Sequence, residues 1–142
     1  MISKILVAVD GSEDSDKAFE YASYLAKRCE ALLLIVHICV EFGKAADKWK
    51  EHDSFVKDLK EASTSMLKKY QTRATESTIS NLKILEAPGD DVAKELLNIA
   101  DEQQIDTIVV GSRGLKAPKE FLLGSVSYKM THYAKCPVIV VR

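Results

Sequence analysis

Three glycines and a serine in the last third of the chain are spaced as in a phosphate-binding loop. Gly111 and Gly114 follow an apolar run that ends at Val110, and nine residues separate the second glycine from Gly124-Ser125. Because glycine has no Cβ, the first pair allows a sharp turn that brings backbone N–H groups close to an anion. Gly124-Ser125 can begin a helix, and the unpaired N–H groups at a helix N-terminus also attract an anion. The pattern therefore predicts a phosphate site.

Two common nucleotide-binding motifs are absent from the sequence. The Walker A motif requires Lys-Ser or Lys-Thr after its second glycine, and the dinucleotide fingerprint is G-x-G-x-x-G; the chain contains neither. What remains is the spacing G-x2-G-x9-G-S. Glycines that follow a strand are also ordinary turn residues, but three of them at this spacing favour the phosphate interpretation.

The elements that must position this loop alternate between apolar runs and amphipathic stretches. A continuous apolar run such as Ile-Leu-Val-Ala-Val at 5–9 is typical of a strand buried on both faces, as in a parallel sheet covered by helices. With right-handed crossovers, the alternation predicts an α/β fold: a single open parallel five-stranded doubly wound sheet, Rossmann-like, with helices on both faces. The expected strands are 5–9, 31–40, 79–86, 107–110 and 137–141, the third being the most polar and hence an edge strand. The expected helices are 12–29, 49–70, 92–100 and 125–134, with a loop at 72–77 and a turn at 88–91.

A doubly wound sheet would bring two loops together. If the first and fourth strands are neighbours, Asp10-Gly11-Ser12 lies opposite the glycines at 111 and 114, in the crevice where such sheets bind ligands. His37 and Ile38, at the end of the second strand, would flank the same crevice. We expect His37 to be a hydrogen-bonded histidine rather than a ligand or a base, and Asp10 could also simply cap the turn that follows it.

Composition excludes several classes of protein. The chain has 142 residues, 46% of them hydrophobic, and 20 basic against 21 acidic residues give a net charge of −1. The length indicates one domain spanning 1–142. The near-equal numbers of basic and acidic residues argue against nucleic-acid binding. The apolar runs are too short for a membrane span or a signal peptide, so the sequence predicts no membrane association and a cytoplasmic location. Cys29, Cys39 and Cys136 have no metal-binding spacing and are expected to be reduced packing residues.

Several segments together resemble one family. They are Ile-Leu-Val-Ala-Val-Asp-Gly-Ser at 5–12, Leu-Leu-Ile-Val-His-Ile at 33–38, Thr-Ile-Val-Val-Gly-Ser-Arg-Gly at 107–114, Leu-Gly-Ser-Val at 123–126 and Cys-Pro-Val-Ile-Val-Val-Arg at 136–142. Across essentially the whole chain, this pattern is similar to that of single-domain universal stress proteins of the ATP-binding type.

The resemblance implies a bound adenine nucleotide: ATP, or AMP or ADP, with or without Mg²⁺. Ala8, Val9 and Asp10 would line the adenosine pocket, the Asp10 carboxylate lying near the ribose or a phosphate-bound metal, and Ile38 would offer backbone groups to the adenine edge. The residues that would wrap the ribose and phosphates are Val110, Gly111, Arg113 and Gly114, and those that would hold the phosphate tail are Gly124, Ser125, Val126 and Ser127. Lys116 and Lys119 could equally screen phosphates or be solvated.

The sequence favours a regulator over an enzyme. Hydrolysis requires a positioned base or water activator, and we find no paired carboxylates and no Ser-His-Asp or Cys-His arrangement. The preferred function is a nucleotide-binding stress-response regulator with at most slow ATP hydrolysis and an unidentified protein partner. An adenine-nucleotide hydrolase or transferase and a nucleotide-free interaction module are the alternatives. The apolar strand that begins at Pro137 and ends at Val141 would need cover at a sheet edge, so we expect a homodimer through it, which is also the arrangement that the resemblance implies.

Overall fold

The computed structural model describes residues 1–40, 52–114 and 123–142 and contains one five-stranded parallel sheet. Its strand order is β3-β2-β1-β4-β5, which confirms the predicted α/β, doubly wound fold class. The strands are β1 (Lys4–Ala8), β2 (Leu32–Val40), β3 (Leu82–Gly89), β4 (Thr107–Gly111) and β5 (Val138–Val141). The helices are α1 (Glu13–Cys29), α2 (His52–Glu76), α3 (Val92–Glu102) and α4 (Ser125–Tyr133).

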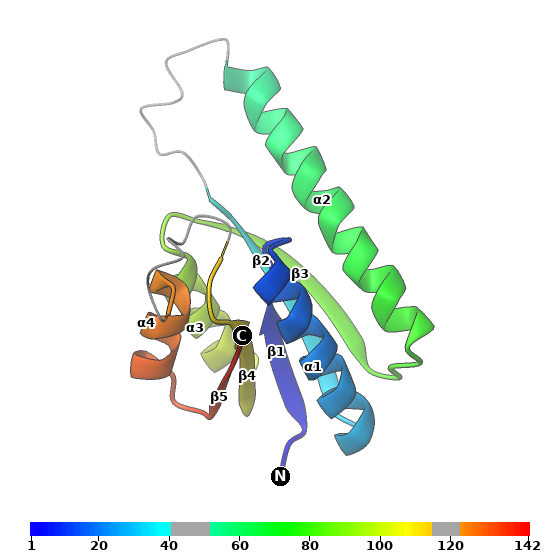
Figure 1. Cartoon of the computed structure of the whole chain (residues 1–142). Helices are drawn as coiled ribbons and strands as arrows, with labels where there is room; N and C mark the ends of the chain where they lie inside the picture. The colour runs from blue at the N-terminus through cyan, green and yellow to red at the C-terminus, as the bar shows by residue number, and fades with distance from the viewer. Residues whose placement is uncertain (41–51, 115–122) are drawn as a thin grey trace.

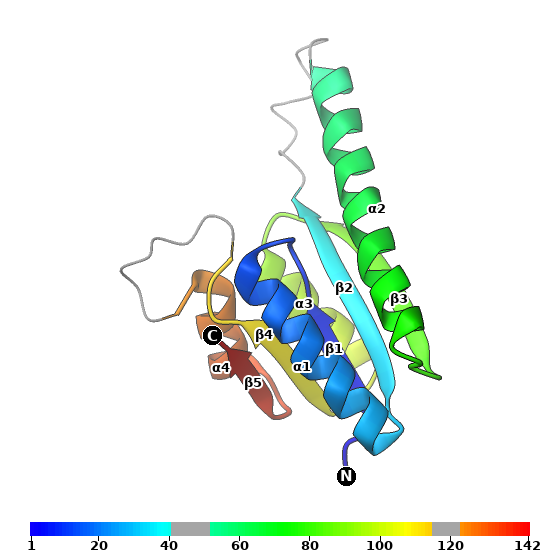
Figure 2. The same ribbon diagram turned by 45° about the vertical axis from the view of Figure 1, so that its right-hand side comes forward.

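Helices cover both faces of the sheet (Figures 1 and 2). α1 and α2 lie on one face, and α3 and α4 lie on the other. Alternate residues of β1 enter two separate cores: Ile5 and Val7 pack under α1 and α2, whereas Leu6 packs under α3 and α4. This two-sided burial explains why the strand sequences are continuously apolar instead of alternating.

The first and fourth strands are neighbours in the sheet, as predicted. β1 pairs with β4 in parallel, with Val7 opposite Val109. β2 lies on the other side of β1, with Ala8 opposite Val36. The chain order therefore reverses between β1 and β4, and the loops that follow these two strands leave the same edge of the sheet.

The predicted loop at 72–77 is wrong, because α2 continues to Glu76. Thr72 and Thr75 satisfy their hydroxyls inside the helix, by donating to the carbonyls of Lys68 and Gln71. Ala74 between them is fully buried. Burial of Ala74 thus helps to extend the helix through a polar stretch that has little helical preference of its own.

The third strand is at the edge, as predicted, but it runs from Leu82 to Gly89. The predicted turn at 88–91 therefore begins too early: Pro88 lies opposite Cys39 and Gly89 opposite Val40. Proline has no N–H to donate, which an edge strand tolerates on its open side. Asp91 then caps α3, its side chain accepting a hydrogen bond from the N–H of Lys94.

Cys29 does not pack as predicted, since its side chain is exposed at the end of α1. Cys39 and Cys136 are half-buried, and all three cysteines are free. Among the helices that the structure describes, none combines the length and the apolar character that crossing a bilayer requires.

Asp106 links the start of β4 to the start of β1 by hydrogen bonds, and we predict that the free energy of unfolding decreases at acid pH as this contact is lost. Its Oδ2 accepts hydrogen bonds from Ser3 N (2.8 Å), Ser3 Oγ (2.6 Å) and Lys4 N (3.0 Å). Burial alone would raise the pKa of Asp106, but these hydrogen bonds outweigh it and hold the pKa below its ordinary value. A lowered pKa contributes stability above the unfolded-state pKa, and that contribution is lost as pH falls through the folded-state pKa.

The variant Asp106→Asn tests this contribution. At pH 7 it should lower the free energy of unfolding by about 1.5–3 kcal/mol, the range for hydrogen bonds to a charged group. As the pH falls through the folded-state pKa of Asp106, the difference from the unaltered protein should shrink, because both side chains are then neutral. Urea unfolding at pH 7 and at successively more acid pH measures this, and a difference that does not change with pH would contradict the assignment.

Candidate functional site

The loop after β1 is held by Asp10 and Ser12. Oδ1 of Asp10 accepts from the N–H of Ser12 at 2.9 Å, which is the capping contact that the sequence allowed as an alternative. Ser12 is the N-cap of α1 and accepts from Ser15 N at 3.2 Å. Gly11, between them, has a φ of +82°, which favours glycine. The loop is thus a turn fixed by side-chain hydrogen bonds from Asp10 and Ser12.

The loop after β4 is anchored through Ser112, which the sequence did not single out. Its N–H donates to Val141 O at 2.7 Å, and its carbonyl accepts from Gly124 N at 2.6 Å. Its buried hydroxyl donates to Oδ2 of Asp14 at 2.7 Å. Ser112 therefore joins β4 to β5, to the start of α4 and to the first turn of α1.

The two loops meet at Gly114 and Asp10, which confirms the predicted convergence. A Cβ built on Gly114 would lie 2.7 Å from Oδ2 of Asp10. The neighbouring Arg113 places Nε 3.8 Å from Oδ2 of Asp14. A carboxylate from the first loop thus faces bare backbone of the second, with a guanidinium alongside, and such backbone can approach a ligand closely.

Gly111 lies in a different environment from Gly114. A Cβ at Gly111 would lie 2.7 Å from the backbone carbonyl carbon of Asp14 and 2.9 Å from its Cβ. Its lack of a side chain allows α1 to pack against the end of β4. The two glycines, which the sequence treats alike, therefore differ: Gly111 lies against the backbone of α1, and Gly114 lies against the Asp10 carboxylate.

The N-terminus of α4 completes this edge of the sheet. Gly124 is the N-cap, with extended backbone and no side-chain hydrogen bond to the first turn, and Ser125 is exposed beside it. Ser127 is different: its side chain is 2% exposed, and its hydroxyl proton is directed at Ser112 O (2.7 Å) and Gly124 O (3.1 Å). Val126 packs against the core under α3 and α4. Any phosphate contact by Val126 would come from its backbone, and Ser127 has already committed its only hydroxyl proton.

The apolar residues predicted for the adenosine pocket and the ribose are largely buried. Val9, Ile38 and Val110 all belong to the cores, and Ala8 is half-buried. Val9 donates its N–H to Val36 O at 2.9 Å and accepts at its carbonyl from Nδ1 of His37 at 2.7 Å. Val9 packs in the core under α1 and α2, whereas Ile38 and Val110 pack in the core under α3 and α4. Their side chains therefore do not converge on one point, and they support the edge of the sheet from its two faces.

His37 is a hydrogen-bonded histidine, as predicted. Because the Val9 carbonyl can only accept, Nδ1 of His37 carries the proton. Nε2 lies 3.2 Å from the hydroxyl of Ser63, on α2. The histidine thus links the end of β2 to β1 and to α2.

Sequence inspection missed Asp14, Ser15 and Tyr70 around this site. Asp14 and Ser15 stand within Asp-Gly-Ser-Glu-Asp-Ser at 10–15, where excess hydroxyls and carboxylates at a helix start were the available signal. Tyr70 comes from α2, and no local signal marks it. Lys116 and Lys119 lie outside the described residues. Within residues 1–40, 52–114 and 123–142, no group of three or more His, Cys, Asp or Glu could hold a metal ion.

Comparison with known proteins gives consistent matches over the full chain. The model of the universal stress protein family matches residues 1–142. Universal stress protein YxiE of Bacillus subtilis is 37% identical, and the match covers 100% of both chains. Universal stress protein UspA from Lactobacillus plantarum has a similar structure, with a TM-score of 0.85, 26% identity and coverage of 99% of this chain and 97% of that one. A universal stress protein in complex with cAMP has a TM-score of 0.72 and 23% identity, over 99% of this chain and 97% of that one.

Proposed function

Since the chain belongs to the universal stress protein family, we propose that it binds an adenine nucleotide at the carboxyl edge of the sheet. The observation that carries the proposal is the approach of the Asp10 carboxylate to Gly114, where a Cβ would come within 2.7 Å of Oδ2. This contact lies where the strand order reverses, which is where open α/β sheets bind ligands. The complex with cAMP supports the ligand class at the level of the fold.

In this proposal, each part of the edge contacts one part of the nucleotide. Asp10 accepts hydrogen bonds from the ribose hydroxyls, or holds Mg²⁺ bound to the phosphates. The loop from Gly111 to Gly114 surrounds the phosphates nearest the ribose, through the backbone of Gly114 and the side chain of Arg113, whereas the N–H of Ser112 is donated to Val141 O. The N-terminus of α4, from Gly124 to Ser127, holds the phosphate tail through the N–H groups that follow Gly124 and the hydroxyl of Ser125, because the N–H of Gly124 is donated to Ser112 O. Ala8, Val9, Ile38 and Val110 support the adenosine.

We propose that the protein is a cytoplasmic stress-response regulator read by a protein partner, with ATP hydrolysis slow if it occurs. A hydrolase would need a base to activate water. In the part of the chain that the structure describes, both ring nitrogens of His37 are engaged, and Asp14 is occupied by Ser112 and Arg113. Binding without rapid turnover fits these contacts better than catalysis does.

Titration calorimetry with ATP, ADP and AMP, each with and without Mg²⁺, tests the proposal. Binding of at least one of them at micromolar to millimolar concentration is expected, together with phosphate release far slower than that of a dedicated ATPase. Rapid turnover would favour the hydrolase or transferase. The absence of any binding would move the protein to the nucleotide-free interaction class.

We also propose a homodimer that forms through β5. This strand is at the sheet edge next to β4, and Val138, Ile139, Val140 and Val141 are all only half-buried. An apolar edge strand is a site for pairing with another chain, and two copies related by a two-fold axis would cover each other.

Light scattering at micromolar concentration should therefore give twice the mass of one chain. Ile139→Lys should shift the protein to the monomer, because two copies of the lysine would approach each other across the two-fold axis. Val92→Lys, on the half-buried edge of α3, is a control for the added charge and should leave the dimer intact. A monomeric unaltered protein would contradict the proposal.

A further inference from the structure

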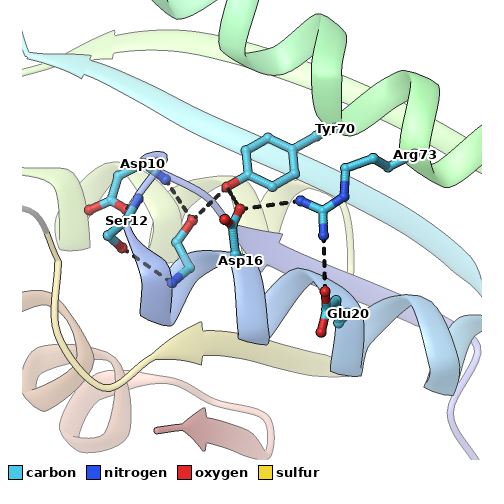
Figure 3. Close-up of polar contacts among 7 residues, drawn as sticks. Asp10, Ser12, Asp16, Glu20, Tyr70 and Arg73 are labelled. Atoms are coloured by element: carbon cyan, nitrogen blue, oxygen red, sulfur yellow. Dashed lines mark hydrogen bonds and ion pairs between the residues drawn. The ribbon is translucent and has the colours of Figure 1, made fainter.

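Three polar side chains connect the loop that carries Asp10 to helix α2 (Figure 3). The N–H of Asp10 donates to Oγ of Ser15 at 3.1 Å, and Oγ lies 3.1 Å from the hydroxyl of Tyr70. The Tyr70 hydroxyl donates to Oδ1 of Asp16 at 2.6 Å. We call these four groups, from the Asp10 N–H to the Asp16 carboxylate, the hydroxyl chain.

The direction of every proton in the hydroxyl chain follows from what each group can donate. A carboxylate only accepts, so Tyr70 must give its single hydroxyl proton to Asp16. Oγ of Ser15 must then donate to Tyr70, and its lone pair accepts from the N–H of Asp10. Hydrogen bonds that run in one direction polarise and strengthen one another. Removing the tyrosine hydroxyl would leave the Ser15 proton without this acceptor.

Tyr70 is held rigidly enough to define that direction. Its side chain is 3% exposed, and its ring packs on Phe19 with the centroids 5.0 Å apart. Burial, and then the hydrogen bond to Asp16, raises the pKa of Tyr70 to about 12, so the hydroxyl keeps its proton at neutral pH. Arg73, one turn along α2, bonds both Asp16 (3.3 Å) and Glu20 (3.2 Å). These contacts clamp α2 to α1 beside the hydroxyl chain.

The hydroxyl chain ends on the residue that faces the glycine loop. Ser15 Oγ holds Asp10 at its N–H, and the N–H of Ser12 holds it at Oδ1. The second carboxylate oxygen, Oδ2, is the nearest atom of the described residues to the Cβ position of Gly114. The orientation of Oδ2 in the site therefore depends on a contact that originates in α2, 60 residues further along the sequence.

We propose that Tyr70 is a positioning residue of the nucleotide site, which acts through Ser15 to orient Asp10. This inference rests on the proposed function for its ligand, an adenine nucleotide. Its chemical content is separate, because it assigns the geometry of Asp10 to a residue that does not touch the nucleotide. It also implies that the nucleotide site and the α1–α2 contact are coupled, since any effect of one on the other is reciprocal.

Tyr70→Phe tests the proposal with two measurements. Amide hydrogen exchange of the nucleotide-free protein is followed at Asp10 and, for reference, at Leu6 in the middle of β1. Exchange at Asp10 should accelerate about five- to tenfold more than at Leu6, the factor expected for one lost neutral hydrogen bond. The dissociation constant for ATP should rise by about three- to tenfold, because an Asp10 that is no longer fixed must be ordered on binding.

Two control variants separate positioning from general destabilisation. Tyr24→Phe makes the same chemical change on α1 at a side chain that is 61% exposed, and both measurements should stay unchanged. Phe19→Leu loosens the packing around Tyr70 without removing a polar atom. It should accelerate exchange at Leu6 and Asp10 by similar factors.

Each outcome bears on the proposal. Selective exchange at Asp10 together with weaker ATP binding supports it. Equal acceleration at Asp10 and Leu6, or selective exchange with unchanged ATP binding, overturns it. If the unaltered protein binds no adenine nucleotide, the proposed function fails and the positioning of a nucleotide fails with it. The exchange comparison still decides separately whether Tyr70 fixes Asp10.

Discussion

Replacing Gly111 with alanine should lower the free energy of unfolding by about 3 kcal/mol, at the upper end for an overpacked core position. The new Cβ would lie 2.7 Å from the backbone carbon of Asp14 and 2.9 Å from its carbonyl oxygen. A backbone in the first turn of a helix cannot move aside as a side chain can. The helix must shift away from β4, and the buried contact between Ser112 and Asp14 (2.7 Å) would be strained as well. Urea unfolding measures the loss.

The matched comparison for this prediction is the other glycine of the same loop. Among the described residues, the nearest atom to a new Cβ at Gly114 is the tip of the Asp10 side chain, and none of the close neighbours that these residues provide is a backbone atom. Gly114→Ala should therefore cost about 1 kcal/mol or less. If the free energy of unfolding of Gly111→Ala lies within about 0.5 kcal/mol of that of the unaltered protein, the glycine is not a packing residue and α1 tolerates displacement.

The contrast between these glycines shows what the sequence could and could not predict. The spacing G-x2-G-x9-G-S placed the loop correctly at the edge shared by β1 and β4. It gave Gly111 and Gly114 one common role, because the distance from each glycine to its neighbours depends on how closely α1 lies over β4. That closeness is a property of the packed fold and has no signal in the loop itself.

The order of strands and helices was predictable because both faces of the sheet are covered. Two-sided burial makes β1 and β4 continuously apolar, and the pattern is visible without knowledge of any partner. Boundaries were missed where tertiary contacts decide them. α2 continues past Tyr70 because Ala74 is buried in the core and Arg73 reaches Asp16 on α1, and Asp16 is more than 50 residues away in sequence.

The polar network of the site was the least predictable part. The sequence singled out Asp10 and predicted that His37 would be satisfied by hydrogen bonds, and the structure bears out the contact of Asp10 with the glycine loop. It could not indicate that Ser15 would accept from the N–H of Asp10 while donating to Tyr70. Serines at a helix start normally cap it, and Ser12 takes that role here, which leaves Ser15 available for a long-range contact.

Gly114→Ala should have its main effect on nucleotide binding. The alanine methyl would force Oδ2 of Asp10 away from the loop, and the carboxylate cannot turn freely because Oδ1 is bonded to Ser12 N. We expect the dissociation constant for ATP to rise by about 10- to 100-fold, or roughly 1.4–2.8 kcal/mol of binding free energy. Calorimetry on the folded variant measures this, with adenosine as a second ligand to show how much of the loss requires the phosphates.

A double-mutant cycle with Asp10→Ala identifies the cause of that loss. If the methyl acts by displacing the Asp10 carboxylate, Gly114→Ala should cost little further affinity once the carboxylate is gone, because the two changes remove the same interaction. If the methyl instead crowds the phosphates directly, its cost for ATP should be the same with and without Asp10, and its cost for adenosine should be small. An unchanged affinity of Gly114→Ala for ATP would contradict both routes and would leave Gly114 as a turn residue outside the nucleotide site.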